Sequence, residues 1–359
     1  MSTRTAFMSS IHNTKLNSIL ERLSATDAKT VALQFPEGLK RQAWQFADEL
    51  KKHGYSVIIS GSPCWGACDL DVAALNEADI LIHYGHAPVD DTEGVIYEYL
   101  TQDIFAGDGG NGGLTADEFT ALLKEAVSLF GAESPEKIGL VTTIQHVHEL
   151  PRVAELLKGM NIVGVIAEGG SRTPYAGQIL GCSYGAARKT GCGNILFIGT
   201  GVFHPTGIAL SAGVGGVGCG GDRPNGKSAT VVALDPFMKR VQLINTDKLL
   251  RQRFAKIEKA RSAERFGIIV SKKSGQRREE LARRLLSLSD KAYLVSLGEI
   301  TPDSLLNLGF DAYVNTSCPR LAYDDQARYP VPMLSPQEFE IVCGVRDWED
   351  YAIDEFDNI

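Results

Sequence analysis

Three cysteines that lie far apart in the chain offer the most specific chemistry in this sequence. Cys64, Cys182 and Cys318 each stand among turn-forming residues, in Ser62-Pro-Cys-Trp-Gly, Leu180-Gly-Cys-Ser-Tyr-Gly and Ser317-Cys-Pro-Arg. Loop cysteines beside glycine and proline are better placed to bind a ligand than to fill a core. Because nothing local holds these thiols together, they can meet only if separate domains bring them together.

Three thiolates suit a 4Fe-4S cluster whose fourth iron stays open to a substrate. Zinc would bring a fourth cysteine or histidine at short spacing, and no such set accompanies all three thiols. Cys64-x-x-x-Cys68 begins like the cysteine triplet of ordinary radical S-adenosylmethionine enzymes, but Asp71 stands in the third place. The alternative is that the three thiols are unrelated buried cysteines. The other cysteines are predicted to be small buried or loop residues: Cys68, Cys192, Cys219 and Cys343.

Three histidines and one arginine are candidates for contacts with a bound cofactor. His83 and His86 follow one predicted strand, His204 follows another, and Arg320 comes shortly after Cys318. The arginine could hold a carboxylate in a bidentate pair. For the histidines, the alternative is a structural or solvated role.

Short apolar runs alternate with helical patterns along the chain, which predicts parallel sheets and an α/β fold. We interpret the order as three similar βαβ domains, at 1–135, 136–262 and 263–359, each with one of the three thiols. In open α/β sheets, ligands bind outside the carboxyl ends of the strands, where all three cysteines are predicted to lie. The expected arrangement is pseudo-threefold and triangular, around a central cluster site. The strands are predicted at 30–35, 55–60, 79–83, 137–141, 162–166, 194–198, 266–270, 292–296 and 311–315.

Other segments carry weaker patterns. Gly221–Ser228 fits the P-loop expression, but a β-branched stretch follows it in place of a helix, so the glycine-rich loop 211–226 receives no role. The glycine-rich residues 107–113 predict a linker. A basic run over 248–265 predicts a helix with a solvated face, with a docking surface for an acidic partner as the alternative. The acidic, aromatic tail after Cys343 is expected to be a solvated segment that packs through its rings.

Composition narrows the class of protein. With 359 residues, of which 44 % are hydrophobic and 22 % charged, the chain is typical of a soluble protein of two or three domains. The formal net charge of −8 argues against a general affinity for nucleic acid. No apolar run of about 18 residues or more appears and the N-terminus lacks a signal pattern, so we expect a cytoplasmic protein without membrane contact. Seven widely spaced cysteines predict metal or redox chemistry and not disulfides.

A set of motifs from all three predicted domains resembles the diphthamide synthesis enzyme family in its archaeal, homodimeric form. The resemblance extends from about residue 30 to about residue 345. The motifs are Leu33-Gln-Phe-Pro-Glu-Gly-Leu, Gly61-Ser-Pro-Cys-Trp-Gly-Ala-Cys-Asp, His83-Tyr-Gly-His-Ala, Gly177-Gln-Ile-Leu-Gly-Cys, Phe203-His-Pro-Thr-Gly-Ile-Ala-Leu, Ala233-Leu-Asp-Pro-Phe and Asn315-Thr-Ser-Cys-Pro-Arg.

The resemblance implies an enzyme of the first step of diphthamide biosynthesis. Such an enzyme cleaves the Cγ–S bond of S-adenosylmethionine reductively at a 4Fe-4S cluster and moves the 3-amino-3-carboxypropyl group to C2 of a histidine imidazole on translation elongation factor 2. The family's cluster ligands match Cys64, Cys182 and Cys318. An electron donor of unknown identity is also implied. We expect Arg320 or a nearby histidine to contact the carboxylate of S-adenosylmethionine.

Two other hypotheses use the same cysteines. One is a 4Fe-4S enzyme of the quinolinate synthase kind, in which the open iron acts as a Lewis acid. The other is a non-catalytic cluster subunit that only passes electrons to a partner.

Overall fold

The computed structural model describes residues 16–105, 113–131, 134–211 and 229–356. These residues form three β-sheets, and the chain divides into two compact units. The first unit contains the chain up to Gln102, and the second contains nearly all of the later residues. The predicted linker at 107–113, the glycine-rich loop at 211–226 with its P-loop match, and Cys219 lie almost wholly outside the described residues.

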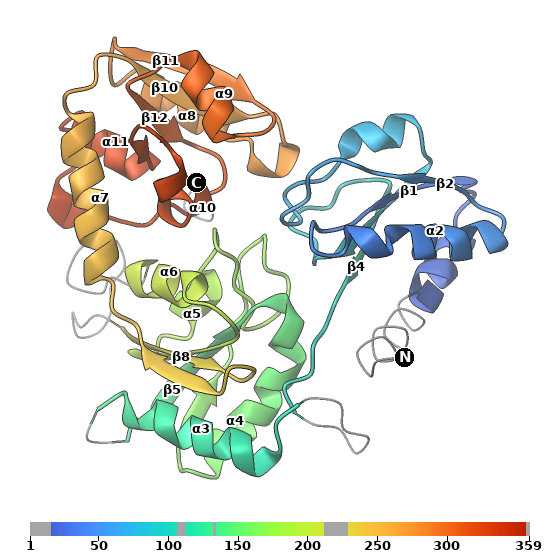
Figure 1. Ribbon diagram of the computed structural model, residues 1–359. Coiled ribbons are helices and arrows are strands. Elements are labelled where there is room, and N and C mark those ends of the chain that lie inside the picture. The colour runs from blue at the N-terminus through green and yellow to red at the C-terminus, as the bar shows by residue number, and fades with distance from the viewer. Residues whose placement is uncertain (1–15, 106–112, 132–133, 212–228, 357–359) are drawn as a thin grey trace. The chain divides into compact units, whose positions relative to one another are not determined.

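The first unit is built on a four-stranded parallel sheet in the order β2-β1-β3-β4. Its core gathers Leu33, Phe35 and Tyr84 from the sheet side with the apolar face of α2 and of the helical residues 16–24. Figure 1 shows α2 lying along this sheet. The elements are β1 (Thr30–Gln34), η1 (Lys40–Gln42), α2 (Ala43–Lys52), β2 (Ser56–Ile59), η2 (Val72–Asn76), β3 (Ile80–Gly85) and β4 (Val95–Tyr99).

The second unit begins with a five-stranded sheet in the order β6-β5-β7-β8-β9, of which only the β8–β9 pair is antiparallel. In Figure 1, α3 and α4 lie on one side of this sheet and α5 and α6 on the other. Its elements are α3 (Ala116–Ser128), β5 (Lys137–Thr142), η3 (Ile144–Glu149), α4 (Leu150–Lys158), β6 (Val163–Val165), α5 (Gly185–Lys189), β7 (Asn194–Ile198), α6 (Phe203–Ser211), β8 (Thr230–Asp235) and β9 (Arg240–Leu243).

Alternation along β7 explains why helices cover both faces of this sheet. Leu196 and Ile198 belong to the core formed with α3 and α4, whereas Ile195 and Phe197 belong to the core on the opposite face. Successive side chains of a strand point to opposite faces, so an unbroken apolar run requires cover on both sides.

The second unit continues through α7 into a four-stranded parallel sheet in the order β11-β10-β12-β13. One apolar core spans this sheet and the α5–α6 face of the previous one, so the two sheets belong to a single compact unit. The elements are α7 (Asp247–Ala260), β10 (Phe266–Ser271), η4 (Ser274–Gln276), α8 (Glu279–Leu286), β11 (Ala292–Leu297), α9 (Pro302–Leu308), β12 (Ala312–Asn315), α10 (Arg320–Tyr323), η5 (Gln326–Arg328), β13 (Met333–Leu334), α11 (Pro336–Val342) and η6 (Trp348–Asp350).

The same strand order recurs in the three sheets, as β2-β1-β3, β6-β5-β7 and β11-β10-β12. In each sheet the first strand of the sequence lies between the second and the third. The predicted α/β fold class with three similar sheets is therefore confirmed. The triangular arrangement around a central site stays a prediction.

The structure departs from three further expectations, which concern a domain boundary, the basic run and the C-terminal tail. Helix α3 lies before the predicted boundary at residue 135, yet it packs in the core of the second sheet; the three domain ranges otherwise stay predictions. The solvated face predicted for the basic run is wrong for Arg253, which is fully buried. The tail is not solvated as predicted, because Ile353, Asp354 and Glu355 are buried, but it does pack through its rings, with Trp348 against Phe254 and Tyr351. None of the helices in the described ranges is long and apolar enough to cross a membrane.

Candidate cluster-binding site

The Cys64 loop follows β2 and is held by side chains of the turn after β1. The Cys64 N–H donates to Glu37 Oε1 at 3.1 Å, and the Glu37 N–H donates to the Cys64 carbonyl at 3.0 Å. Lys40 Nζ donates to Glu37 Oε1 and to the carbonyls of Gly61 and Ser62. These bonds hold a loop that has no regular secondary structure of its own. The turn after β1 therefore sets the position of the buried Cys64.

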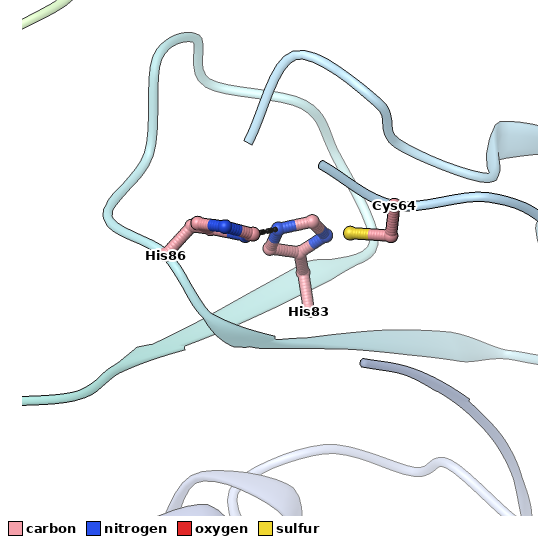
Figure 2. A group of neighbouring side chains, drawn as sticks. All are labelled: Cys64, His83 and His86. Atoms are coloured by element: carbon pink, nitrogen blue, oxygen red, sulfur yellow. Dashed lines mark hydrogen bonds between the residues drawn. The ribbon is translucent and has the colours of Figure 1, made fainter. Parts of the chain in front are cut away.

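Two histidines at the end of β3 lie beside Cys64 (Figure 2). One possible ligand atom from each of Cys64, His83 and His86 lies within 4.8 Å of the others. His83 Nε2 and His86 Nδ1 are 3.0 Å apart, and His83 Nδ1 is 2.9 Å from Gln34 Oε1. The structure thus brings both histidines to the thiol of the first unit, while their contact with S-adenosylmethionine stays a prediction.

Gln34 decides which nitrogen of each ring carries the proton. Its Nε2 donates to the Asp69 carbonyl at 2.7 Å, so its Oε1 is the acceptor for the Asp71 N–H and for His83 Nδ1–H. His83 Nε2 must then accept from His86 Nδ1–H, which leaves a lone pair on His86 Nε2. Both imidazoles are neutral in this chain of hydrogen bonds.

Burial keeps all three groups uncharged. It raises the pKa of the Cys64 thiol to about 12, with a further contribution from Asp69. Burial likewise lowers the pKa of His83 to about 3 and that of His86 to about 4. A cation at this position would bind the thiolate and release its proton, because metal binding requires the deprotonated ligand.

In the second unit, the phenol of Tyr184, two residues after Cys182, is fully buried. Burial raises the pKa of Tyr184, and the charges of Glu355, Cys182 and Cys318 as ionised groups raise it further. The Tyr184 hydroxyl donates to the Gly181 carbonyl at 3.0 Å, which ties the ring to the residue before Cys182. Cys182 and Cys318 are each partly exposed.

His204 and Arg320 come together at the start of α6 and α10. Burial lowers the pKa of His204 to about 4, and the positive charge of Arg320 contributes to the same direction. The Arg320 guanidinium lies 5.0 Å from the centre of the Phe203 ring and donates to Asp324 Oδ2 from Nη2 at 2.5 Å. Arg320 is exposed, so it can reach a ligand carboxylate by exchanging this partner.

The candidate residues thus divide between the two units. Cys64, His83 and His86 lie together in the first unit. Cys182, Cys318, His204 and Arg320 all lie in the second. The convergence of Cys64 with the other two thiols stays a prediction. Sequence reasoning missed Gln34, whose signal was a single amide inside the apolar run Val31-Ala-Leu-Gln-Phe. It also missed Tyr184, which has no signal beyond its place after Cys182.

Comparison with known proteins identifies the family. The family model of diphthamide synthesis proteins matches residues 35–352. The chain belongs to the diphthamide synthesis family. A 2-(3-amino-3-carboxypropyl)histidine synthase of Pyrococcus horikoshii is 34 % identical over 351 residues, which cover 96 % of this chain and 94 % of that one. Subunit 1 of the corresponding synthase of Nematostella vectensis is 29 % identical, over 94 % of this chain and 69 % of that one.

Two solved structures of Dph2 from Pyrococcus horikoshii share the fold of this family member. One contains a 4Fe-4S cluster and matches with a TM-score of 0.77 and 33 % identity, over 95 % of this chain and 93 % of that one. The other matches over the same shares of the two chains with a TM-score of 0.80 and 32 % identity. The resemblance to the diphthamide synthesis family is therefore confirmed, whereas its archaeal, homodimeric form stays a prediction.

Proposed function

We propose that this chain is a 3-amino-3-carboxypropyltransferase that acts in the first step of diphthamide biosynthesis. Its substrates would be S-adenosylmethionine and a histidine imidazole of translation elongation factor 2, which is modified at C2. The observation that carries the proposal is membership of a family whose relatives are 2-(3-amino-3-carboxypropyl)histidine synthases. The thiols on strand-end loops of both units support it.

The residues fit a 4Fe-4S cluster by the chemistry of their donor atoms. Cys64, Cys182 and Cys318 would hold it as thiolates, the usual ligands of such clusters. The high pKa of Cys64 means that its sulfur becomes a thiolate only when a cation compensates the buried charge. Bound there, the cluster supplies the electron for reductive cleavage of the Cγ–S bond of S-adenosylmethionine.

The chain's own polar groups would position the methionyl part of the co-substrate. Arg320 can donate to its carboxylate in a bidentate pair. In the hydrogen-bond chain from Gln34, the unprotonated Nε2 of His86 can accept a hydrogen bond, for example from an ammonium group. His204 is neutral because its pKa is low, so it adds no charge beside Arg320. This positioning matters because a transferred group must be held close to its acceptor.

Two partners are implied by the proposal. Elongation factor 2 must dock so that one histidine reaches the transferred group, and an electron donor must reduce the cluster. We also infer a homodimer, from the resemblance to the archaeal form of the family. A general affinity for nucleic acid is not part of the proposal, in keeping with the net charge of −8.

The test is an anaerobic assay of the reduced, purified protein with S-adenosylmethionine and elongation factor 2. We expect release of methylthioadenosine and a gain in mass on the elongation factor that equals one aminocarboxypropyl group. Cys64→Ala, Cys182→Ala and Cys318→Ala should each lose bound iron, sulfide and activity. Cys192→Ala is the matched control, because Cys192 is buried and its thiol donates to the neighbouring Thr190 carbonyl.

Several outcomes would count against this function. Wild-type iron content in any of the first three variants would remove that cysteine from the ligand set. Zinc in place of iron would point to a different metal centre on Cys64, His83 and His86. A fully loaded cluster that leaves S-adenosylmethionine intact would favour the quinolinate synthase kind of Lewis-acid chemistry or an electron-transfer subunit.

A further inference from the structure

The last described residues of the chain, Ile353–Phe356, form a buried segment that we call the C-terminal strap. Ile353, Asp354 and Glu355 are 2 %, 1 % and 3 % exposed. Burying two carboxylates in succession is costly unless each has charged or hydrogen-bonding partners. Each of them is paired with an arginine, and both arginines lie next to a cysteine loop. The strap begins after the last residue that the family model matches, which is residue 352.

Asp354 is connected through Arg278 to the loop that carries Cys318. The Arg278 guanidinium donates to Asp354 Oδ1 at 2.9 Å from Nη1 and to Oδ2 at 2.5 Å from Nη2. Arg278 Nε also donates to the Thr316 carbonyl at 2.7 Å, and Nη2 donates to the Ser317 carbonyl at 3.2 Å. The carboxylate thus fixes the plane of a guanidinium that holds the two peptide groups directly before Cys318.

Glu355 and Phe356 hold the loop that carries Cys182. Arg188 Nη1 donates to both oxygens of Glu355, at 2.7 and 2.8 Å, and the Tyr184 N–H donates to Glu355 Oε2 at 3.2 Å. The Phe356 N–H donates to the carbonyl of Cys182 itself at 2.8 Å. The backbone at Cys182 and at Tyr184 is therefore tied to the strap.

The Phe356 ring contacts one arginine on the Cys182 side and one arginine on the Cys318 side of the second unit. The guanidinium of Arg172 lies 4.4 Å and that of Arg278 lies 4.3 Å from the centre of this ring. Arg172 belongs to the chain before Cys182, and it also donates to the Gly275 carbonyl at 2.8 Å, next to the start of α8. Cation–π contacts between the same ring and two arginines connect both halves of the second unit.

We propose that the C-terminal strap is a positioning element that sets the separation of the Cys182 and Cys318 sulfurs. Neither loop is part of a helix or strand at its cysteine, so the Leu180–Ser183 backbone bridge around Cys182 and the side-chain and strap hydrogen bonds determine where each sulfur lies. The inference deepens the proposed function, because a shared cluster requires the two sulfurs at a fixed distance. Asp354 and Glu355 are positioning residues that touch no reacting atom.

The first experiment measures the separation without any cluster. In the full-length chain, alanine replaces Cys64, Cys68, Cys192, Cys219 and Cys343, so that only Cys182 and Cys318 remain. Dibromobimane becomes fluorescent when it bridges two neighbouring thiols, and we expect it to bridge this pair. Asp354→Asn and Glu355→Gln should lower the yield of the bridged product about tenfold, the effect of losing one charge-assisted hydrogen bond.

Glu340→Gln is the matched control. Glu340 is also buried and accepts from two arginines, Arg284 and Arg346, and none of these contacts involves the Cys182 or the Cys318 loop. In the two-cysteine protein, Glu340→Gln should leave the yield of the bridged product unchanged, even if it lowers the free energy of unfolding. An unbridged parent protein would overturn the proposal, as would equal yields in all variants with unchanged circular dichroism.

The second experiment uses the wild-type holoprotein and the same three variants. Iron loss to a chelator should be about tenfold faster in Asp354→Asn and Glu355→Gln than in Glu340→Gln, and the spectrum of the reduced cluster should change only in those two. If the wild-type protein binds no iron, the proposed function fails while the bridging result still decides the role of the strap. If the cluster is present and neither strap variant changes the rate of iron loss or the spectrum of the reduced cluster, the strap proposal fails and the proposed function stands.

Discussion

The buried ion pair between Arg253 and Glu338 gives the sharpest prediction about stability. Both side chains are fully buried. All five N–H groups of Arg253 have acceptors: the two oxygens of Glu338, the carbonyls of Ala322 and Met333, and Gln326 Oε1. The guanidinium of α7 thereby joins α10, β13 and α11, of which α10 begins two residues after Cys318.

Glu338→Gln keeps the volume of the side chain and removes its charge. We expect a loss of about 3–5 kcal/mol in the free energy of unfolding, because the charge of Arg253 stays buried without a counterion. That is a large part of the about 5–15 kcal/mol typical of a folded domain. Arg253→Met should cost a similar amount for the same reason. The double variant Arg253→Met/Glu338→Leu should cost clearly less than the sum of the single variants.

The measurement is urea unfolding followed by circular dichroism, with extrapolation to zero denaturant. Glu155→Gln is the control, because it removes the charge from an exposed pair with Lys158 and should change stability little. The reasoning is refuted if Glu338→Gln is no more costly than this control. Additive losses in the double variant would refute it too, because they would show that the two charges do not depend on each other.

Two further predictions concern the surroundings of the cysteine loops. In Gly207→Ala, the new Cβ would lie 2.0 Å from the Tyr184 hydroxyl oxygen, so the ring must shift, and we expect a loss of about 1–3 kcal/mol in urea unfolding. Gly298→Ala is its control, since nothing lies within 4 Å of that Cβ, and equal losses would contradict the expectation. Burial lowers the pKa of His204 from 6.5 to about 4, so the unfolded state takes up a proton first as the pH falls. The free energy of unfolding should therefore decrease as the pH falls from 6.5 towards 4, and it should decrease less steeply in His204→Phe than in the wild type. Equal slopes of this free energy against pH in the two proteins would count against the low pKa of His204.

The repeated strand pattern and the loops that carry the thiols were predictable from the order of residues alone. Strands such as β1, β7, β10 and β12 are short apolar runs between turn residues, and this signal is local. Cys64, Cys182 and Cys318 stand next to glycine or proline, which predicts loops without knowledge of any contact. The sequence likewise predicted that His83 and His86 follow a strand, and this position placed them at the same sheet edge as Cys64.

The roles of the charged residues, in contrast, emerged only from the folded chain. Arg253 lies in a run of basic residues and Glu355 lies in an acidic tail, and both patterns predicted solvated segments. Each is buried because its partner comes from a part of the chain far away in sequence: Glu338 for Arg253 and Arg188 for Glu355. Hydrophobic periodicity reports which face of an element is apolar, but a buried charge depends on a counterion that the local sequence does not contain.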